Sequence, residues 1–292
     1  MKNIKKYPNF GTNKLNLDRI CLIKIQRQKM EKILTIAGSD CSGGAGIQAD
    51  IKTITAHKMY AMSVITALTA QNTTGVFGVF ETPSEFVEAQ IKACFDDIVP
   101  NAVKIGMVSN SQIIKSIAKM LKFYNAKNVV VDPVMVATSG GVLMRNDAVN
   151  SLIDELFALA TIVTPNLSEA EVLSEMKIKN IDDMKKSAQK IAKLTNGAVL
   201  VKGGHLGEEA VDILYENGEF SEFRAPKIDT KNSHGTGCTL SSAIACGLGA
   251  NLSLKEAVKN AKEFVFNALS WSEQIGHGNG AINHYFGIEK RF

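Results

Sequence analysis

Short apolar runs alternate with helix-like segments from residue 32 to residue 202, and this alternation constrains the fold more than any other feature of the chain. The apolar runs are rich in Val, Ile and Leu and have the length of buried strands. The segments between them carry apolar residues at helical spacing, as Phe86, Val87, Ile91 and Phe95 do. Strands that alternate with helices predict an α/β fold whose central, mostly parallel sheet is covered by helices on both faces.

The boundaries of the expected elements follow from these runs and from the glycine-rich and polar stretches between them. Strands are expected at residues 32–37, 60–70, 102–105, 128–132, 161–164 and 198–202. Helices are expected at residues 47–57, 84–98, 111–124, 146–159, 167–175 and 181–195, with Ser84 as an N-cap. Loops are expected at 38–46 and 71–75. Residues 211–228 contain an Asn-Gly turn and predict a small antiparallel addition.

The run His234–Ala243 places Gly235 and Gly237 in a turn that opens a helix. The first N–H groups of a helix have no intrahelical acceptor, and the helix dipole adds partial positive charge, so such a turn can bind an anion. Cys238 lies where a thiolate is also favoured. The alternative interpretation is an ordinary tight turn with Cys238 as a small buried hydrophobic residue.

Composition and charge narrow the class of protein. The chain has 292 residues, 45% hydrophobic and 21% charged, which is typical of a globular protein. Residues 1–29 hold eight Lys or Arg and one Asp, so they account for the net charge of +4 and leave a mildly acidic remainder. We expect residues 1–29 to be a basic extension outside the core, or an artefact of the assigned start site, and residues 30–292 to form a single domain.

Several classes of partner are not expected. A mildly acidic body gives no reason to expect nucleic acid, and no apolar run reaches the length that would span a membrane. The five cysteines include no Cys-x-x-Cys pair, which speaks against a disulfide framework and a zinc site and favours a reducing, cytoplasmic compartment.

Ligands of parallel sheets collect at the carboxyl ends of the strands, and candidate site residues follow several of the expected strands. Asn166 and Glu169 open a helix on one face, where Glu169 can hold a hydrated Mg2+ with help from Asn166. A helix capping box explains the same pair. Asp132 precedes Pro133 and can organise Mg2+ or phosphate, or simply form a turn.

Three further residues are candidates for phosphate or substrate binding. Lys202 comes before Gly203-Gly204 and suits a phosphate, although it can also be a solvated lysine before a turn. Asp50 and Gln71 can each read a small polar ring by hydrogen bonds. Asp50 can equally be an exposed helix residue.

Competing motifs fit less well. The segment 44–49 matches G-x-G-x-x-A of dinucleotide-binding proteins, but no acidic residue between Asp50 and Glu81 is available for the ribose. The chain has no G-x-x-x-x-G-K-[ST], which argues against a Walker-type NTPase, and no H-E-x-x-H.

The motifs GSDCSGGAGIQAD, TALTAQNTTGV, KIGM, VDPVM, TPNLSEA, VKGGH and NSHGTGCTLSSAIA occur in this order. In the order of these motifs the chain resembles the ribokinase-like superfamily, and within it the hydroxymethylpyrimidine/phosphomethylpyrimidine kinases of thiamine biosynthesis. The resemblance covers roughly residues 30–284. The resemblance implies ATP-dependent phosphorylation of 4-amino-5-hydroxymethyl-2-methylpyrimidine and then of its monophosphate. It also implies ATP and Mg2+ as cofactors and a homodimer.

The resemblance also assigns roles by position. Gln71 would hydrogen-bond the aminopyrimidine, and Gly38, Ala45, Asp50, Thr69 and Met107 would line its pocket. Mg-ATP would be organised by Asp132, Asn166, Glu169 and Lys202. Gly235, Thr236, Gly237 and Cys238 would form the anion hole at the transferring phosphate. Sugar kinases of the superfamily carry Asp where Cys238 stands, so Cys238 is either the base or a positioning group. His205 and His234 match family positions and are expected to be structural.

Two alternatives stay open at this stage. Some members with the same Gly-x-Gly-Cys turn phosphorylate pyridoxine or pyridoxal, although the motif that contains Gln71 favours an aminopyrimidine. A non-catalytic pyrimidine-binding sensor of the same fold is the second alternative, and the presence of Cys238, Asn166, Glu169 and Lys202 argues against it.

Overall fold

The computed structural model describes residues 30–135, 146–204 and 209–288. The predicted extension at residues 1–29 and the predicted structural residue His205 lie outside the described residues. Whether residues 30–292 form a single domain stays a prediction.

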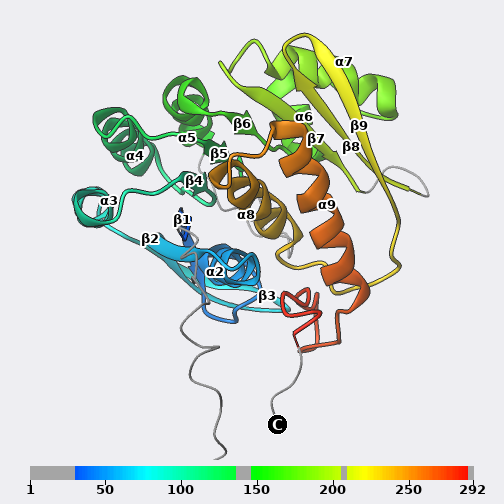
Figure 1. Cartoon of the computed structure of the whole chain (residues 1–292), viewed down its shortest axis with the longest axis horizontal. Helices are drawn as coiled ribbons and strands as arrows, with labels where there is room; N and C mark the ends of the chain where they lie inside the picture. The colour runs from blue at the N-terminus through cyan, green and yellow to red at the C-terminus, as the bar shows by residue number, and fades with distance from the viewer. Residues whose placement is uncertain (1–29, 136–145, 205–208, 289–292) are drawn as a thin grey trace, which may run out of the picture.

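Nine strands of the described residues form one sheet in the order β3-β2-β1-β4-β5-β6-β7-β8-β9 (Figure 1). From β2 to β7 along this order, neighbouring strands are parallel, while β3, β8 and β9 pair antiparallel with their neighbours. The predicted mostly parallel sheet with a small antiparallel addition is therefore confirmed. The strands are β1 (Lys32–Asp40), β2 (Tyr60–Asn72), β3 (Gly75–Glu81), β4 (Ala102–Ile105), β5 (Val129–Val131), β6 (Ile162–Val163), β7 (Ala198–Gly203), β8 (Glu209–Glu216) and β9 (Glu219–Pro226).

Helices cover both faces of this sheet, as predicted (Figure 1). One face carries α3 to α7, and the other carries α2, α8 and α9. The helices are α2 (Gly46–Ala56), α3 (Ser84–Asp97), α4 (Ser111–Phe123), α5 (Asn146–Ser151), α6 (Leu167–Ser174), α7 (Ile181–Ile191), α8 (Thr236–Gly249) and α9 (Leu254–Ser270). A π-helical segment, Leu152–Leu156, and a 3-10 turn, Phe157–Leu159, follow α5.

Strand residues alternate between the two layers of core because side chains on a strand point to opposite faces. On β5, Val129 and Val131 join the core beneath α3–α7, whereas Val130 joins the core beneath α2, α8 and α9. Leu34 and Ile33 of β1 divide in the same way. Both faces of the central strands are therefore apolar, which explains why the sequence shows continuous apolar runs rather than alternation.

The largest difference from the expected elements lies in residues 71–81. The predicted loop at 71–75 is shorter, because β2 continues to Asn72 and β3 begins at Gly75. No strand was expected at β3, and its residues Phe77, Gly78, Val79 and Phe80 are exposed. An edge strand with both faces in water carries no alternating hydrophobic signal, so the pattern does not reveal it.

Other boundaries differ for local reasons. β1 continues through Asp40 because Ser39 and Asp40 pair with β2 beyond a register shift, so the expected glycine-rich loop begins later. Ser84 is not a cap: Pro83 precedes the helix, and its carbonyl accepts from the amides of Phe86 and Val87.

The expected helix at 146–159 is interrupted. The carbonyl of Phe157 accepts from Thr195 Oγ1 at 2.7 Å, and that of Ala158 accepts from Asn196 Nδ2 at 3.0 Å. These tertiary contacts hold the end of the segment. The expected helix at 181–195 is also shorter than predicted, because α7 ends at Ile191 and Thr195, one of the two donors, lies beyond it. The helix α9 was not among the expected elements, although Ser253 and Glu256 form a capping box at its start.

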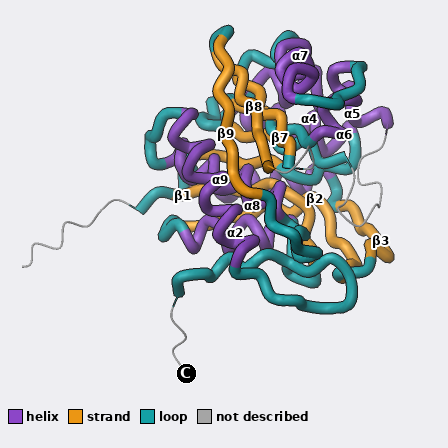
Figure 2. Tube along the Cα trace, turned by 90° about the vertical axis from the view of Figure 1, so that its right-hand side faces the viewer, coloured by secondary structure: helices purple, strands orange, loops and turns teal. Residues whose placement is uncertain are grey.

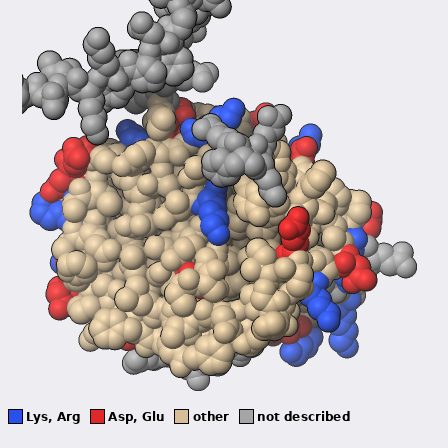
Figure 3. All heavy atoms as spheres, turned by 90° about the horizontal axis from the view of Figure 1, so that it is seen from below, with Lys and Arg blue, Asp and Glu red and all other residues tan. Residues whose placement is uncertain are grey.

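The segment after α9, residues 271–288, returns to the sheet edge as loops and turns (Figure 2). Its Asn279 amide donates to the carbonyl of Thr73 at 2.9 Å, and its Gly278 amide donates to Thr73 Oγ1 at 3.1 Å. These bonds connect the C-terminal part of the chain to the turn between β2 and β3. The face seen in Figure 3 is formed mainly by uncharged residues, with most Lys, Arg, Asp and Glu towards its rim and some blue and red nearer its middle.

The core beneath α3–α7 yields a stability test at Phe157, which is fully buried. Phe157→Ala removes the ring from this core and is expected to lower the free energy of unfolding by about 3–5 kcal/mol. Phe123→Ala is the control, because its ring is 76% exposed and its loss should cost about 0.5 kcal/mol or less. Urea denaturation measures both, and equal losses would contradict the assignment of Phe157 to the core.

Candidate active site

The predicted site residues come from the carboxyl ends of parallel strands and from the first turns of α2, α6 and α8. Lys202, at the end of β7, places its Nζ 2.7 Å from Asp132 Oδ1, which follows β5. A Cβ atom added to Gly237, in the first turn of α8, would lie 3.4 Å from that Nζ and 3.6 Å from Asp132 Oδ2. The start of α8 therefore lies beside a partly buried cation and a buried carboxylate.

The turn before α8 is built by glycine, as the sequence predicts. Gly235 has φ of 87° and caps the helix, which begins at Thr236. A side chain at Gly235 would place its Cβ 2.0 Å from the carbonyl oxygen of Gly44, so the two backbones approach as closely as only glycine allows. The predicted helix N-terminus is confirmed. Its Thr236 amide donates to the Ser233 carbonyl at 3.3 Å, whereas the amides of Gly237 and Cys238 lie in the first turn, where a helix offers no internal acceptor.

The electrostatics of Cys238 contradict the predicted thiolate. Burial raises the pKa of Cys238 to about 11, and Asp50 and Asp132 raise it further, while Lys104 and a hydrogen bond from the Gly46 backbone lower it. The effect of a helix N-terminus is a fraction of a charge, which is too small to offset burial together with two carboxylates. Cys238 therefore carries a protonated thiol at neutral pH.

Asp132 is a buried carboxylate with more than one donor. It is 2% exposed, and in addition to Lys202 its Oδ1 accepts from Thr164 Oγ1 at 3.1 Å. Its Oδ2 has a longer contact, 3.4 Å, with Ser241 Oγ. Burial alone lowers the pKa of Lys202, but Asp132 and Glu169 outweigh it, so the pKa is raised and the ammonium group stays charged.

Asn166 and Glu169 form a capping box at the start of α6, so the helix-cap interpretation of this pair is confirmed. Asn166 Oδ1 accepts from the Glu169 amide at 2.9 Å, and Glu169 Oε2 accepts from the Asn166 amide at 2.8 Å. Burial raises the pKa of Glu169 to about 7, Lys202 lowers it and Asp132 raises it. A capping box and a metal ligand are compatible, because Glu169 Oε1 has only a 3.5 Å contact with the Met135 amide.

Asp50 lies on α2, within the expected helix. It is not an exposed helix residue, because it is fully buried and both of its oxygens lie 2.9 Å from Lys104 Nζ. Thr35 Oγ1 and Ser242 Oγ also donate to it, at 2.5 and 2.7 Å. Asp50 is therefore engaged beneath the site rather than pointing with free acceptors at a ligand.

The predicted pyrimidine-binding residues gather around the ends of β1 and β2. Gln71 Oε1 accepts from Thr69 Oγ1 at 3.1 Å, and Gln71 Nε2 lies 3.4 Å from His234 Nε2. Gly38 lies against Met107, since a Cβ at Gly38 would be 2.9 Å from the Met107 sulfur. Ala45 is the N-cap residue of α2.

Sequence reasoning missed Asp40, which holds the loop between β1 and α2. Its carboxylate accepts from the amides of Gly44 and Ala45 at 3.1 and 2.9 Å, from Ser42, and from His234 Nε2 at 2.9 Å. Burial alone would raise the pKa of Asp40, but these hydrogen bonds, above all the one to His234, lower it to about 2. An Asp before a glycine-rich turn was the available signal, since such side chains commonly bond the amides that follow.

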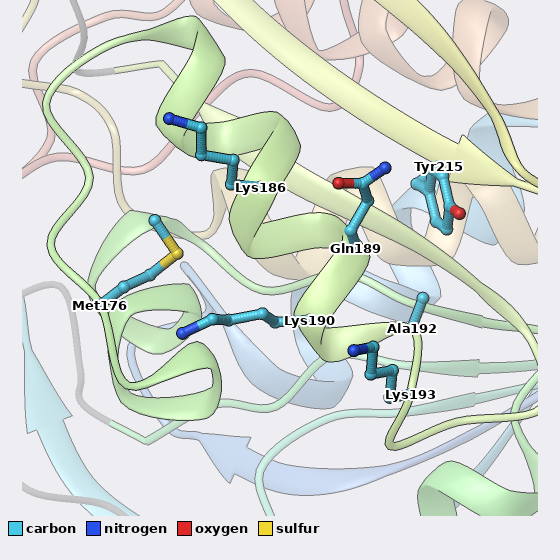
Figure 4. A pocket seen from close by; sticks show the side chains of 7 residues that line it. All are labelled: Met176, Lys186, Gln189, Lys190, Ala192, Lys193 and Tyr215. Carbon is cyan, nitrogen blue, oxygen red and sulfur yellow. The ribbon is translucent and has the colours of Figure 1, made fainter.

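A hollow of about 640 Å3 lies elsewhere, beside α7 (Figure 4). It is open, three lysines border it, and none of the predicted site residues lines it. Its lining residues are Met176, Lys186, Gln189, Lys190, Ala192, Lys193 and Tyr215.

Comparison with known proteins identifies the family. Residues 40–283 match the family model described as phosphomethylpyrimidine kinase. The chain belongs to the phosphomethylpyrimidine kinase family. A hydroxymethylpyrimidine/phosphomethylpyrimidine kinase from Rhizobium meliloti (strain 1021) is 50% identical over 256 residues, which is 86% of this chain and 96% of that protein. The family and the class of activity predicted from the motifs, a kinase, are thus confirmed.

Solved structures of two kinds are similar to this member of the family. A phosphomethylpyrimidine kinase from Clostridium difficile 630 is 49% identical, with a TM-score of 0.72 over 80% of this chain and 97% of that one. A Bacillus subtilis pyridoxal kinase, solved as an ADP complex, is 38% identical, with a TM-score of 0.81 over 88% of this chain and 98% of that one. These neighbours confirm the predicted ribokinase-like fold.

Two findings concern only the part of the chain that the structure describes. None of its helices has both the length and the apolar composition needed to cross a bilayer. Within the same residues, no three His, Cys, Asp or Glu side chains gather as a ready-made metal cluster.

The raised pKa of Glu169 predicts a pH-dependent loss of stability in this kinase. The folded state holds the proton more tightly than the unfolded state, so stability falls as the pH rises from 4.5 towards about 7. Glu169→Gln keeps the capping box and removes the charge. The melting temperature of Glu169→Gln minus that of the unmodified chain should therefore increase from pH 5 to pH 8.

The control is Glu171→Gln on the same helix, because a hydrogen bond from Lys177 lowers the pKa of Glu171 instead of raising it. This variant should show no such rise. A constant difference between Glu169→Gln and the unmodified chain, measured by differential scanning calorimetry, would mean that Glu169 is ionised throughout this range.

Proposed function

We propose that this chain transfers the terminal phosphoryl group of ATP to the hydroxymethyl group of 4-amino-5-hydroxymethyl-2-methylpyrimidine, and then phosphorylates the monophosphate. The observation that carries this proposal is the arrangement of Lys202 and Asp132 beside Gly237 at the start of α8. Phosphoryl transfer requires positioning and charge stabilisation more than covalent chemistry. A helix N-terminus with an adjacent ammonium group supplies both to a phosphate.

The amides of Gly235, Thr236, Gly237 and Cys238 are proposed to hold the transferring phosphate, and Lys202 to neutralise it. Because Cys238 keeps its proton, we assign it to positioning the attacking hydroxyl by a hydrogen bond rather than to acting as the base. The hydroxyl proton then passes late to an oxygen of the phosphoryl group that is being transferred, in keeping with a loose transition state.

Asp132 and Glu169 are the residues that would hold Mg2+, with Asn166 and Lys202 organising the nucleotide. Each carboxylate keeps one lightly engaged oxygen, since Asp132 Oδ2 and Glu169 Oε1 have contacts of 3.4 and 3.5 Å. Mg2+ commonly uses one or two carboxylates together with waters and substrate phosphates, so this pair suits it. The ion would offset the negative charge of the phosphates.

For the pyrimidine, we propose Gln71 as the hydrogen-bonding residue, with Gly38, Ala45, Thr69 and Met107 around the ring. Gln71 carries a donor and an acceptor on one planar group, which matches the edge of an aminopyrimidine. Asp50 supports this site through its hydrogen bonds with Lys104 and Ser242 rather than by touching the ring.

A pyridoxal kinase activity is the second candidate. A Staphylococcus aureus pyridoxal kinase in complex with AMP-PCP and pyridoxal is 35% identical, with a TM-score of 0.82 over 89% of this chain and 96% of that one. The higher identity to pyrimidine kinases favours the first candidate.

We further propose a homodimer in the cytoplasm. The edge strand β3 exposes Phe77 and Phe80, which are 70% and 69% accessible, and its six residues before Glu81 are uncharged. The opposite edge, β9, carries Glu222 and Arg224, the kind of charge that prevents edge pairing. The four cysteines of the described residues are free thiols, as a reducing compartment requires.

The deciding experiment measures ATP consumption by the purified chain with Mg2+ and with hydroxymethylpyrimidine, its monophosphate and pyridoxal in parallel. We expect turnover of both pyrimidines and little turnover of pyridoxal. Cys238→Ala should lower kcat by at least about tenfold through lost positioning, while Cys94→Ala, on α3, serves as the matched control. Turnover of pyridoxal alone would assign the chain to vitamin B6 salvage instead.

Gln71→Leu tests whether Gln71 hydrogen-bonds the pyrimidine substrate. The change removes the donor and acceptor at similar volume and should weaken pyrimidine binding by about tenfold to a hundredfold while leaving ATP binding nearly unchanged. Gln189→Leu, in the hollow beside α7, is the control and should affect neither ligand. Calorimetric titration with each ligand measures both effects, and equal losses for pyrimidine and ATP would rule out this role for Gln71.

A further inference from the structure

Lys104 of the KIGM motif has no role in the site described above, yet its side chain is fully buried. It lies on β4, near the carboxyl end of the strand, and its Nζ donates to both oxygens of Asp50 at 2.9 Å. Burial lowers the pKa of Lys104, but Asp50, Cys238 and Asp132 raise it above its ordinary value. The ammonium group therefore stays charged.

Four elements meet at this ion pair. Asp50 belongs to α2 and Lys104 to β4, while the other two donors to Asp50 are Thr35 of β1 and Ser242 of α8. Every partner is fully buried, so water does not compete for these bonds. The pair thus connects the second turns of α2 and α8 to two central strands.

The helices α2 and α8 are joined at two successive levels. At the upper level, the Gly46 backbone hydrogen-bonds to Cys238. One turn further along each helix, Ser242 Oγ donates to Asp50 at 2.7 Å. The lower contact therefore holds α8 against α2 one helical turn from the Cys238 sulfur.

Gly106 shows that the motif is built around the lysine. A Cβ at Gly106 would lie 2.6 Å from Lys104 Nζ and 3.1 Å from the Cβ of Ala37. Any larger residue would displace the ammonium group from Asp50. The Lys-x-Gly spacing of the motif is explained by this close approach rather than by a turn.

Stability alone is a weak reason for such a pair. Transferring two charges into a dry interior costs several kcal/mol per ion, and well-packed apolar replacements are often neutral or stabilising. We propose that Lys104 is a positioning residue of the phosphoryl-transfer site, which through Asp50 holds the first turn of α8 in place and supplies positive charge beneath the Cys238 thiol. This inference rests on the proposed function of the α8 N-terminus.

The charges that act on Cys238 come from several elements of the fold. Lys104 of β4 and Lys202 of β7 favour its ionised form, whereas Asp50 of α2 and Asp132 after β5 oppose it. Removing Lys104 or Asp50 should therefore change the ionisation of the thiol in opposite directions. A merely structural role would instead loosen the helix start in both variants and change thiol reactivity in the same direction.

The test compares Lys104→Met, Asp50→Asn and the control Lys262→Met in the full chain. Lys262 forms a similar buried pair with Asp212 at 2.7 Å between α9 and β8, so its loss reproduces the removal of a buried lysine away from Cys238. The readout is the rate of iodoacetamide alkylation of Cys238 from pH 7 to pH 10, followed by mass spectrometry of its peptide. A change of one pKa unit alters the thiolate fraction by about tenfold.

We expect alkylation about three- to tenfold slower in Lys104→Met and faster by a similar factor in Asp50→Asn, with no change in Lys262→Met. With the two pyrimidines as substrates, kcat should fall by about tenfold to a hundredfold in both site variants. The KM for ATP should stay within about threefold, because Lys202 is untouched.

Alkylation changes in the same direction for both site variants, or kcat equal to that of the unmodified chain, would overturn the proposal. Should Lys104→Met fail to fold, Lys104→Gln takes its place, because it removes the charge and keeps a donor towards Asp50, and slower alkylation is again expected. The alkylation result does not depend on the substrate, so the expected changes without turnover of any pyrimidine would refute the proposed function and leave the placement of Lys104 supported.

Discussion

The close approach of the α8 start to the loop between β1 and α2 is the constraint on which the rest of the site depends. Gly235 and Gly44 meet backbone to backbone, and a single Cβ at Gly235 would lie 2.0 Å from the Gly44 carbonyl oxygen. Asp40 and His234 join the same two segments by a buried 2.9 Å hydrogen bond. Because both contacts are buried and too close to allow movement, the helix N-terminus and the glycine-rich loop form one rigid unit.

Charge around this unit is arranged in two buried layers. The upper layer contains Asp132, Lys202 and Glu169, and the shifted pKa values of Lys202 and Glu169 show how strongly these groups interact. The lower layer is the pair of Asp50 and Lys104. A cysteine between these layers is surrounded by carboxylates as well as ammonium groups, which explains why a helix N-terminus does not make it a thiolate. The site thus favours hydrogen bonding by a thiol over proton abstraction.

Sequence identity and structural superposition rank the relatives of this chain differently, although all of them share one fold. The pyrimidine kinases are more similar in sequence, up to 50% identical, whereas pyridoxal kinases superimpose over more of the chain, with a TM-score of 0.81. A shared scaffold of strand ends and helix starts can serve either ring, because phosphate positioning is common to both reactions. Discrimination then rests on the few polar groups near the ring, with Gln71 as the principal candidate.

The sequence by itself determined the parallel sheet, the layers of helices and the glycine-built start of α8, because these depend on local patterns: buried apolar runs, helical spacing and backbone that only glycine permits. Long motifs determined the family. The sequence did not reveal β3, because an exposed edge strand has no periodic signal. It also did not reveal the role of Asp40, because the partner of Asp40, His234, is distant in the chain.

Only the tertiary structure decided the states of Cys238 and Asp50. A local pattern placed the thiol at a helix N-terminus, but its pKa depends on burial and on Asp132 and Lys104, which come from other elements. Asp50 in the same way reads as a polar helix residue until Lys104, 54 positions away, is placed against it. Burial and long-range charge pairs are properties of the packed chain, so no segment carries them alone.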